Sequence, residues 1–185
     1  MDSKLQIISG SFKGRKLRIP ASARPTQNRA RIALFNMLQS LDIMPRVVWD
    51  AFAGSGAFGL EILSRYPDAR VAFTDIDAAT VKIIRDNLRT LNADTRAVAV
   101  QTDALGALDK YGADAELIFV DPPYAMADVA RGFITQLGGV ARPGALVVWE
   151  QDSRISVAPD ADAWEVLRDK EYGRARFLIF RRKGE

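Results

Sequence analysis

The sequence contains neither cysteine nor histidine in its 185 residues. The absence of cysteine excludes disulfides, thiolate zinc sites and cysteine nucleophiles. The absence of histidine excludes Ser-His-Asp catalysis and imidazole metal clusters, so we expect no metal site. A reaction compatible with this inventory relies on positioning, hydrogen-bond acceptors and a reactive cofactor.

Long apolar runs and a secretory signal are also missing, because no hydrophobic stretch approaches the ~20 residues that a membrane span needs. We therefore expect a cytoplasmic protein without a membrane partner. A hydrophobic content of 48% in a chain of this length fits one domain with a full core. No apolar stripe remains beyond what that core needs, which favours a monomer.

Acidic residues are scarce at the amino terminus. The first 31 residues hold eight basic side chains and one acidic one, whereas the remaining 154 hold 18 basic and 22 acidic ones. A basic segment on a mildly acidic body is typical of contact with nucleic-acid phosphates, although a solvated terminus has the same composition. Residues 5–8 and 16–19 predict a β-hairpin, and the expected RNA contacts in this region are Lys13, Arg15, Lys16, Arg24 and Arg29. We accordingly divide the chain into a basic extension, 1–24, and a main domain, 25–185.

Short apolar runs alternate with helical periodicity along the main domain. Strands are predicted at 47–49, 70–74, 98–100, 117–120 and 146–149, followed by two more at 165–167 and 177–180. Helices are predicted after Pro25, with Thr26 as N-cap, and at 79–91 and 126–138. Such alternation predicts an α/β fold with a parallel sheet covered by helices on both faces.

A glycine-rich turn follows the first of these strands. Gly54, Gly56 and Gly59 have the spacing of a nucleoside-binding turn between a strand and a helix. Asp75 ends the next strand and is the acidic residue that would bind both ribose hydroxyls. Asp50, directly before the turn, would repel the phosphates of a dinucleotide but suits the cationic S-adenosylmethionine. The simpler interpretation is an aspartate that caps a strand end.

Asp121-Pro122-Pro123-Tyr124 follows a further buried strand and must lie just past its carboxyl end, where ligands bind in open α/β sheets. A carboxylate, a carbonyl and an aromatic ring held at fixed positions suit a planar base with an exocyclic amine. The simpler interpretation is a strand end followed by a turn.

With these motifs the chain resembles the bacterial 16S ribosomal RNA guanine-N2 methyltransferases, and the likeness covers nearly the whole chain. It is carried by residues 10–17, 24–26 with Arg29, 33–36, 50–56, 75–77, 103–105, 121–124 and 170–173. The sequence departs from the family pattern at Asn28 and Ile32, near which acidic residues are expected.

The resemblance implies a Rossmann-like class I methyltransferase fold that uses S-adenosylmethionine. Its seven-stranded, mostly parallel sheet would have an antiparallel last strand and carry the small amino-terminal hairpin. It further implies that 50–56, including Phe52 and Ser55, wrap the methionine part of the cofactor. Asp75 and Ile76 would lie at the ribose, and Asp103 and Ala104 at the adenine. Asp121 and the Pro122 carbonyl would accept the two N2 protons of a flipped guanine, on which Tyr124 stacks.

The implied substrate is one guanine in 16S ribosomal RNA, in an assembled or assembling small subunit. The same tetrad would also serve methylation of adenine N6 or cytosine N4 in DNA, or of a protein glutamine. A nicotinamide-dependent reductase shares the glycine pattern but not the tetrad. A nucleic-acid-binding module without catalysis is the third alternative.

Overall fold

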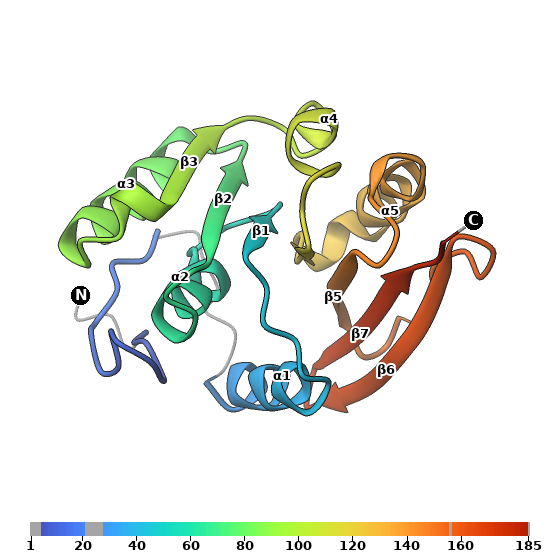
Figure 1. Cartoon of the computed structure of the whole chain (residues 1–185), viewed down its shortest axis with the longest axis horizontal. Coiled ribbons are helices and arrows are strands. Elements are labelled where there is room, and N and C mark those ends of the chain that lie inside the picture. Colours follow the sequence, from blue (N-terminus) through green and yellow to red (C-terminus); the bar gives the residue numbers. More distant parts are fainter. Residues whose placement is uncertain (1–4, 21–27, 156, 185) are drawn as a thin grey trace.

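The computed structural model describes residues 5–20, 28–155 and 157–184. In this part of the chain the strands form one seven-stranded sheet of order β3-β2-β1-β4-β5-β7-β6 (Figure 1). Its members are β1 (Val47–Asp50), β2 (Arg70–Asp75), β3 (Ala97–Gln101), β4 (Leu117–Val120), β5 (Leu146–Asp152), β6 (Trp164–Tyr172) and β7 (Ala175–Arg182). The last strand, β7, runs antiparallel between β5 and β6, which confirms the predicted topology.

Helices cover both faces of this sheet. The longer ones are α1 (Asn28–Ser40), α2 (Ala57–Arg65), α3 (Ala78–Thr90) and α5 (Ala127–Val140), and the shorter ones are α4 (Leu108–Tyr111), η1 (Asp94–Arg96) and η2 (Tyr124–Met126). The helices α1, α2 and α3 share one buried cluster, while α4 and α5 share the other, across the sheet (Figure 1). The predicted N-cap Thr26 lies outside the described residues.

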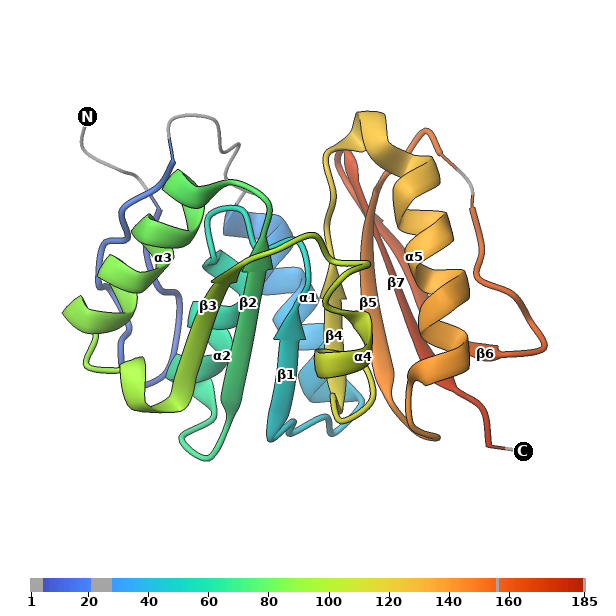
Figure 2. The same ribbon diagram turned by 90° about the horizontal axis from the view of Figure 1, so that it is seen from above.

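The central strands read as continuous apolar runs because both of their faces are covered. In β4 all four residues are buried, with Phe119 in the cluster of α1 to α3 and Ile118 in the cluster of α4 and α5. The strands β1, β2 and β4 point the same way, so their carboxyl ends meet at one edge of the sheet (Figure 2). A ligand site built on strand ends must therefore lie at that edge.

The predicted amino-terminal hairpin is present, and its two arms are joined by one antiparallel bridge between Gln6 and Lys16. Its apolar residues Leu5, Ile7 and Leu17 are buried in the same cluster as α1, α2 and α3.

Polar groups on two helices fix the hairpin further. Glu61 of α2 is fully buried and accepts hydrogen bonds from the backbone N–H groups of Ile8 (2.8 Å) and Ser9 (2.9 Å). The side-chain amide of Asn87 in α3 pairs with the backbone N–H and carbonyl of Arg18, each at 2.9 Å. The hairpin is therefore attached along the outer side of α2 and α3.

Candidate nucleoside and base site

Three predicted site carboxylates end three adjacent strands. Asp50 closes β1 and lies in register with Phe73 on β2 and Phe119 on β4. Asp75 and Asp121 each follow those partners by two residues, and residues two apart on a strand share a face. The carboxylates of Asp75 and Asp121 both act electrostatically on Asp50, so the three lie near one another at this edge of the sheet.

The glycine turn between β1 and α2 has the conformation that its sequence predicts. Gly54 and Gly56 have φ angles of 50° and 71°, in the left-handed region that favours glycine. The N–H of Gly54 donates to Asp75 Oδ2 at 2.9 Å, which ties the turn to the end of β2. A Cβ on Gly59 would lie 2.3 Å from Phe73 Cε1, so glycine is what permits the close packing of α2 on β2.

Asp50 is 1% exposed and only partly satisfied. Its Oδ2 accepts the Gly59 N–H at 3.1 Å, which realises the capping role considered from the sequence. Its Oδ1 is buried without a hydrogen-bond partner. Burial raises the pKa of Asp50 well above its usual range, the Gly59 N–H opposes that rise, and the carboxylates of Asp121 and Asp75 add to it. A cation bound here would satisfy Oδ1 and offset the repulsion, so the donor set fits the sulfonium and ammonium groups of S-adenosylmethionine.

Asp121 follows β4 directly, and burial raises its pKa to about 7. Pro122 is buried and Pro123 is exposed, and the Pro123 carbonyl accepts the Met126 N–H at 2.7 Å to close the turn η2. A pocket beside this turn is lined by the two prolines together with Ala127, Trp149, Asp152 and Ile155. The prolines therefore fix the backbone that follows Asp121. Tyr124 opens η2, and its stacking role stays a prediction.

The predicted adenine side of the site lies at the ends of β2 and β3. Ile76 follows β2 with 75% of its surface exposed, which is unusual for a large apolar side chain. Asp103 is exposed beyond β3, and Ala104 next to it is buried. Phe52, in the glycine turn, is half-buried and packs edge-on against Phe133 of α5 at 5.4 Å. Ser55 accepts the N–H of Ala57 at 3.3 Å.

The predicted RNA-binding residues are separated in space. Gly10 to Phe12 pack on Ser64, near the carboxyl end of α2, where the N–H of Ser11 donates to the Ser64 carbonyl at 2.8 Å. Arg15 donates to the carbonyl of Thr90 at the end of α3 (3.0 Å). The hairpin tip therefore lies at the opposite edge of the sheet from Asp121.

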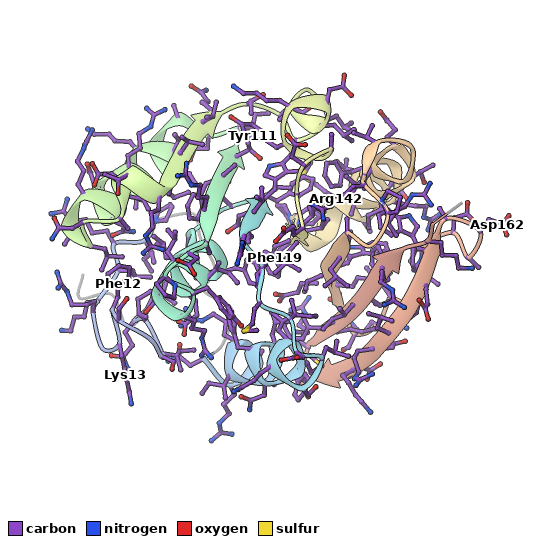
Figure 3. All side chains as sticks on the ribbon, viewed as in Figure 1. Phe12, Lys13, Tyr111, Phe119, Arg142 and Asp162 are labelled. Carbon is purple, nitrogen blue, oxygen red and sulfur yellow. The ribbon has the colours of Figure 1, made fainter. Side chains whose placement is uncertain are left out.

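Lys13 projects outward at this tip (Figure 3), and Lys16 is exposed as well. Arg29 is exposed in the first turn of α1 and not on the hairpin. Arg24 is outside the described residues.

Two supporting residues were missed from the sequence. Thr74, fully buried in β2, accepts the indole N–H of Trp49 at 2.9 Å and donates to the Ala51 carbonyl at 2.9 Å. These bonds fix the ends of β1 and β2 beneath the glycine turn. Glu61 was missed too, although a lone acidic residue among Leu60, Ile62 and Leu63 is itself a signal of a buried polar role.

Within the residues described, no group of three Asp, Glu, His or Cys side chains is arranged to hold a metal ion. The described helices likewise include none with the length and hydropathy to cross a bilayer.

Comparisons with known proteins agree with this architecture. Residues 5–181 match the family model described as Conserved hypothetical protein 95. Ribosomal RNA small subunit methyltransferase D of Escherichia coli strain K12 is 33% identical over 186 residues, which cover 98% of this chain and 92% of that protein. A solved structure from Escherichia coli, named as a methyltransferase, has a TM-score of 0.82 at 32% identity and covers 98% of this chain and 99% of its own.

An RNA methyltransferase from Salinibacter ruber, solved with S-adenosyl-L-homocysteine, has a TM-score of 0.67 at 19% identity, over 88% of this chain and 95% of its own. That likeness shows the fold, and together with the Escherichia coli structure at 32% identity it confirms the predicted Rossmann-like methyltransferase fold. From the family match and the identity over the whole chain together, this protein belongs to the Conserved hypothetical protein 95 family, that of the small-subunit ribosomal RNA methyltransferases D.

Proposed function

We propose that this chain transfers a methyl group from S-adenosylmethionine to the exocyclic N2 amine of one guanine in 16S ribosomal RNA. The observation that carries the proposal is the group of carboxylates at the ends of β1, β2 and β4 around the unpaired Oδ1 of Asp50. A buried carboxylate whose pKa is raised by burial and by two neighbouring carboxylates favours a cationic ligand over a phosphate-bearing one. This electrostatic preference separates S-adenosylmethionine from nicotinamide dinucleotides.

The bound cofactor supplies an electrophilic methyl group, and the chain supplies its binding and the orientation of the base. Asp50 binds the cationic part of the cofactor, with Phe52, Ser55 and the glycine turn around it. Asp75 retains lone pairs for the ribose hydroxyls, since each of its oxygens accepts one backbone N–H, from Gly54 and from Asp77. Ile76, Asp103 and Ala104 bind the adenine.

The target amine is oriented by the tetrad after β4. Asp121 and the Pro122 carbonyl accept the two N2 protons and localise the lone pair, while Tyr124 stacks on the base. Orientation of this kind contributes up to ~10 kcal/mol in well-aligned systems. The Asp121 carboxylate also stabilises positive charge that develops on N2, and a pKa near 7 suits it to take the leaving proton.

Lys13, Arg15, Lys16, Arg24 and Arg29 bind the RNA phosphates electrostatically. Lys13, Arg15 and Lys16 lie on the hairpin, beyond the carboxyl end of α2, so the RNA contacts extend beyond the catalytic edge and suit a folded small subunit better than a short strand. We propose an assembled or assembling subunit as substrate and a monomer as the enzyme.

The proposal is tested by methyl transfer from labelled S-adenosylmethionine to small subunits of a strain lacking the enzyme, followed by mapping of the modified nucleotide. One N2-methylguanine in 16S RNA is the expected product, and Asp121→Ala should bind cofactor without transfer. Label on DNA or on a protein glutamine would move the substrate to those alternatives. If the cofactor binds but no label is transferred to any of these substrates, the chain would instead be a non-catalytic nucleic-acid-binding module.

A further inference from the structure

A hollow of about 350 Å³ lies at the edge of the sheet opposite the proposed active site. It is placed there because α2 ends beside it and β1 and β2 begin within a few residues of its walls (Figure 2). Its volume falls in the range of ~300–1,000 Å³ in which small-ligand sites lie. The residues that matter for its chemistry are Gly10 of the hairpin, Asp42 and Met44 before β1, and Arg65 and Tyr66 at the end of α2.

Arg65, in the last turn of α2, is held in a fixed position at this hollow. Its Nε donates to the fully buried Glu61 at 2.8 Å, and its guanidinium lies 4.4 Å from the centre of the Phe35 ring. Only 18% of the side chain is exposed. Among the described residues, the two terminal nitrogens of Arg65 have no hydrogen-bond partner. A guanidinium fixed in this way can bind an acceptor with little loss of side-chain entropy.

The cluster behind the hollow carries one positive charge in excess. Glu61 lies 3.9 Å from Nη2 of Arg31 as well, so one carboxylate serves two guanidinium groups. The backbone N–H groups of Ile8 and Ser9 donate to the same carboxylate. Burial lowers the pKa of Arg31, Glu61 opposes that change and Arg65 adds to it. An electron-rich acceptor in the hollow would offset this excess of positive charge.

The other walls supply apolar surface and further polar groups. Met44 is 71% exposed, which is unusual for a large apolar side chain. Burial raises the pKa of Tyr66, with Arg65 opposing the rise, so its hydroxyl is a neutral donor at pH 7. Asp42, exposed at a φ of 55°, adds an acceptor. Apolar surface together with donors and acceptors is the combination by which proteins bind unpaired RNA bases.

The hollow also borders the basic hairpin tip. The carbonyl of Gly10, on its wall, accepts the N–H of Lys13 at 3.2 Å, so the exposed Lys13 is one turn away. Lys13 projects outward from this turn (Figure 3). An RNA whose phosphates contact the hairpin tip therefore passes close to the hollow.

We propose that this hollow binds an unpaired base of the RNA whose phosphates contact the hairpin tip. The inference rests on the proposed function and adds a contact to a base where composition indicated phosphate contacts alone. Arg65 would donate to acceptors on the edge of the base, and Met44 would cover part of its face. The six residues of β2 separate the hollow from Asp75 by roughly 20 Å, so this base is not the one that is methylated.

The test measures the affinity of the whole chain for protein-free 16S RNA and for unmethylated small subunits, between about 50 and 200 mM salt. Arg65→Lys keeps the charge beside Glu61 but removes the guanidinium fork. Met44→Ala removes apolar surface at an exposed position that the fold does not need. Val166→Ala is the matched control, because Val166 is 46% exposed on β6, at the end of the sheet away from α2 and α3. Unfolding curves, binding of S-adenosylhomocysteine and base-specific chemical probing of the RNA accompany each variant.

We expect Arg65→Lys to bind protein-free RNA about tenfold more weakly at every salt concentration, with an unchanged log–log salt slope, because a base contact is lost and no phosphate contact. Met44→Ala should bind about threefold more weakly through its lost apolar contact, and Val166→Ala should match the wild type. One base of the RNA should be protected from probing by the wild type and become reactive with Arg65→Lys.

A salt slope that falls together with the affinity would overturn the inference, since Arg65 would then act by ordering the hairpin and its phosphate contacts. Unchanged affinity in both hollow variants would overturn it too, and so would a loss confined to small subunits, which would assign the hollow to a ribosomal protein. If Arg65→Lys does not fold, Met44→Ala decides alone. A wild type that binds RNA in the expected way but transfers no methyl group would refute the proposed function and leave the base site standing.

Discussion

Replacing Asp121 by Asn should stabilise the ligand-free protein while abolishing its activity. The pKa of Asp121 rises from 3.8 to about 7 on folding because the carboxyl is buried, so its ionised form disfavours the folded state. The penalty is absent below pH 4, grows as the pH rises through the interval between these values, and is complete above pH 7. The whole shift corresponds to about 4 kcal/mol. We reduce this to about 2 kcal/mol because part of the surface of residue Asp121 remains exposed, and solvent there screens the charge.

Thermal unfolding at pH 5 and pH 8 tests this reasoning. At pH 8, Asp121→Asn should raise the midpoint by roughly 4–8 °C, and at pH 5 by less than half of that, in line with about 2–4 °C per kcal/mol for a chain of this size. Asp114→Asn, at an exposed aspartate, is the control and should shift neither curve by more than a degree or two. Equal stabilisation at both pH values, or destabilisation at pH 8, would refute the assignment of Asp121 as a desolvated carboxylate.

Four further predictions follow from the structure. Gly59→Ala should cost about 1–3 kcal/mol of unfolding free energy in denaturant titrations, since its Cβ would overlap a phenyl ring, whereas Gly139→Ala in open space on α5 should cost nothing or stabilise slightly. Glu61→Ala should cost about 3–5 kcal/mol in the same titrations, because two backbone N–H groups lose their acceptor and the buried Arg31 loses its ion-pair partner, and a loss under 1 kcal/mol would contradict the burial of that network. Lys13→Glu with Arg15→Glu should weaken RNA binding and spare cofactor binding, and equal RNA affinity would remove the hairpin tip from the interface. A bound sulfonium cation favours the ionised forms of Asp50 and Asp121, so the protein should release more protons near pH 7 when it binds S-adenosylmethionine than when it binds S-adenosylhomocysteine, whose sulfur is neutral. Calorimetry in buffers of different ionisation enthalpy measures this proton release, and identical release for the two ligands would contradict cation binding beside these carboxylates.

Local sequence patterns were sufficient to predict the strands of the sheet and the central residues of the site. Four consecutive apolar residues at 117–120 predict β4, because a strand that is covered on both faces has no solvent-facing positions for polar residues. The glycines at 54, 56 and 59 predict the turn because their roles depend on backbone conformation and on one nearby strand. The position of Asp121 follows from its prolines, which cannot continue a strand.

Contacts between distant segments were not predictable in the same way. Nothing near Asp152 in the sequence indicates that Arg174, 22 positions later, shares its carboxylate, since that pairing depends on the antiparallel return of β7. The basic hairpin was predicted as a hairpin, but its composition carries no information about which edge of the sheet it faces. That direction is decided by Glu61 and Ser64 on α2, through bonds to backbone groups that every sequence possesses.

The attachment of the amino-terminal hairpin also sets an order of events during synthesis. Residues 8 to 15 emerge first, yet their partners on α2 and α3 follow between 52 and 75 positions later. Until those helices emerge, the buried groups of the hairpin have no acceptors and closure of so long a loop has no contacts to offset its entropy. The amino-terminal hairpin is therefore expected to dock after α3 has formed. Its docking would be a late step in folding and not part of the folding nucleus.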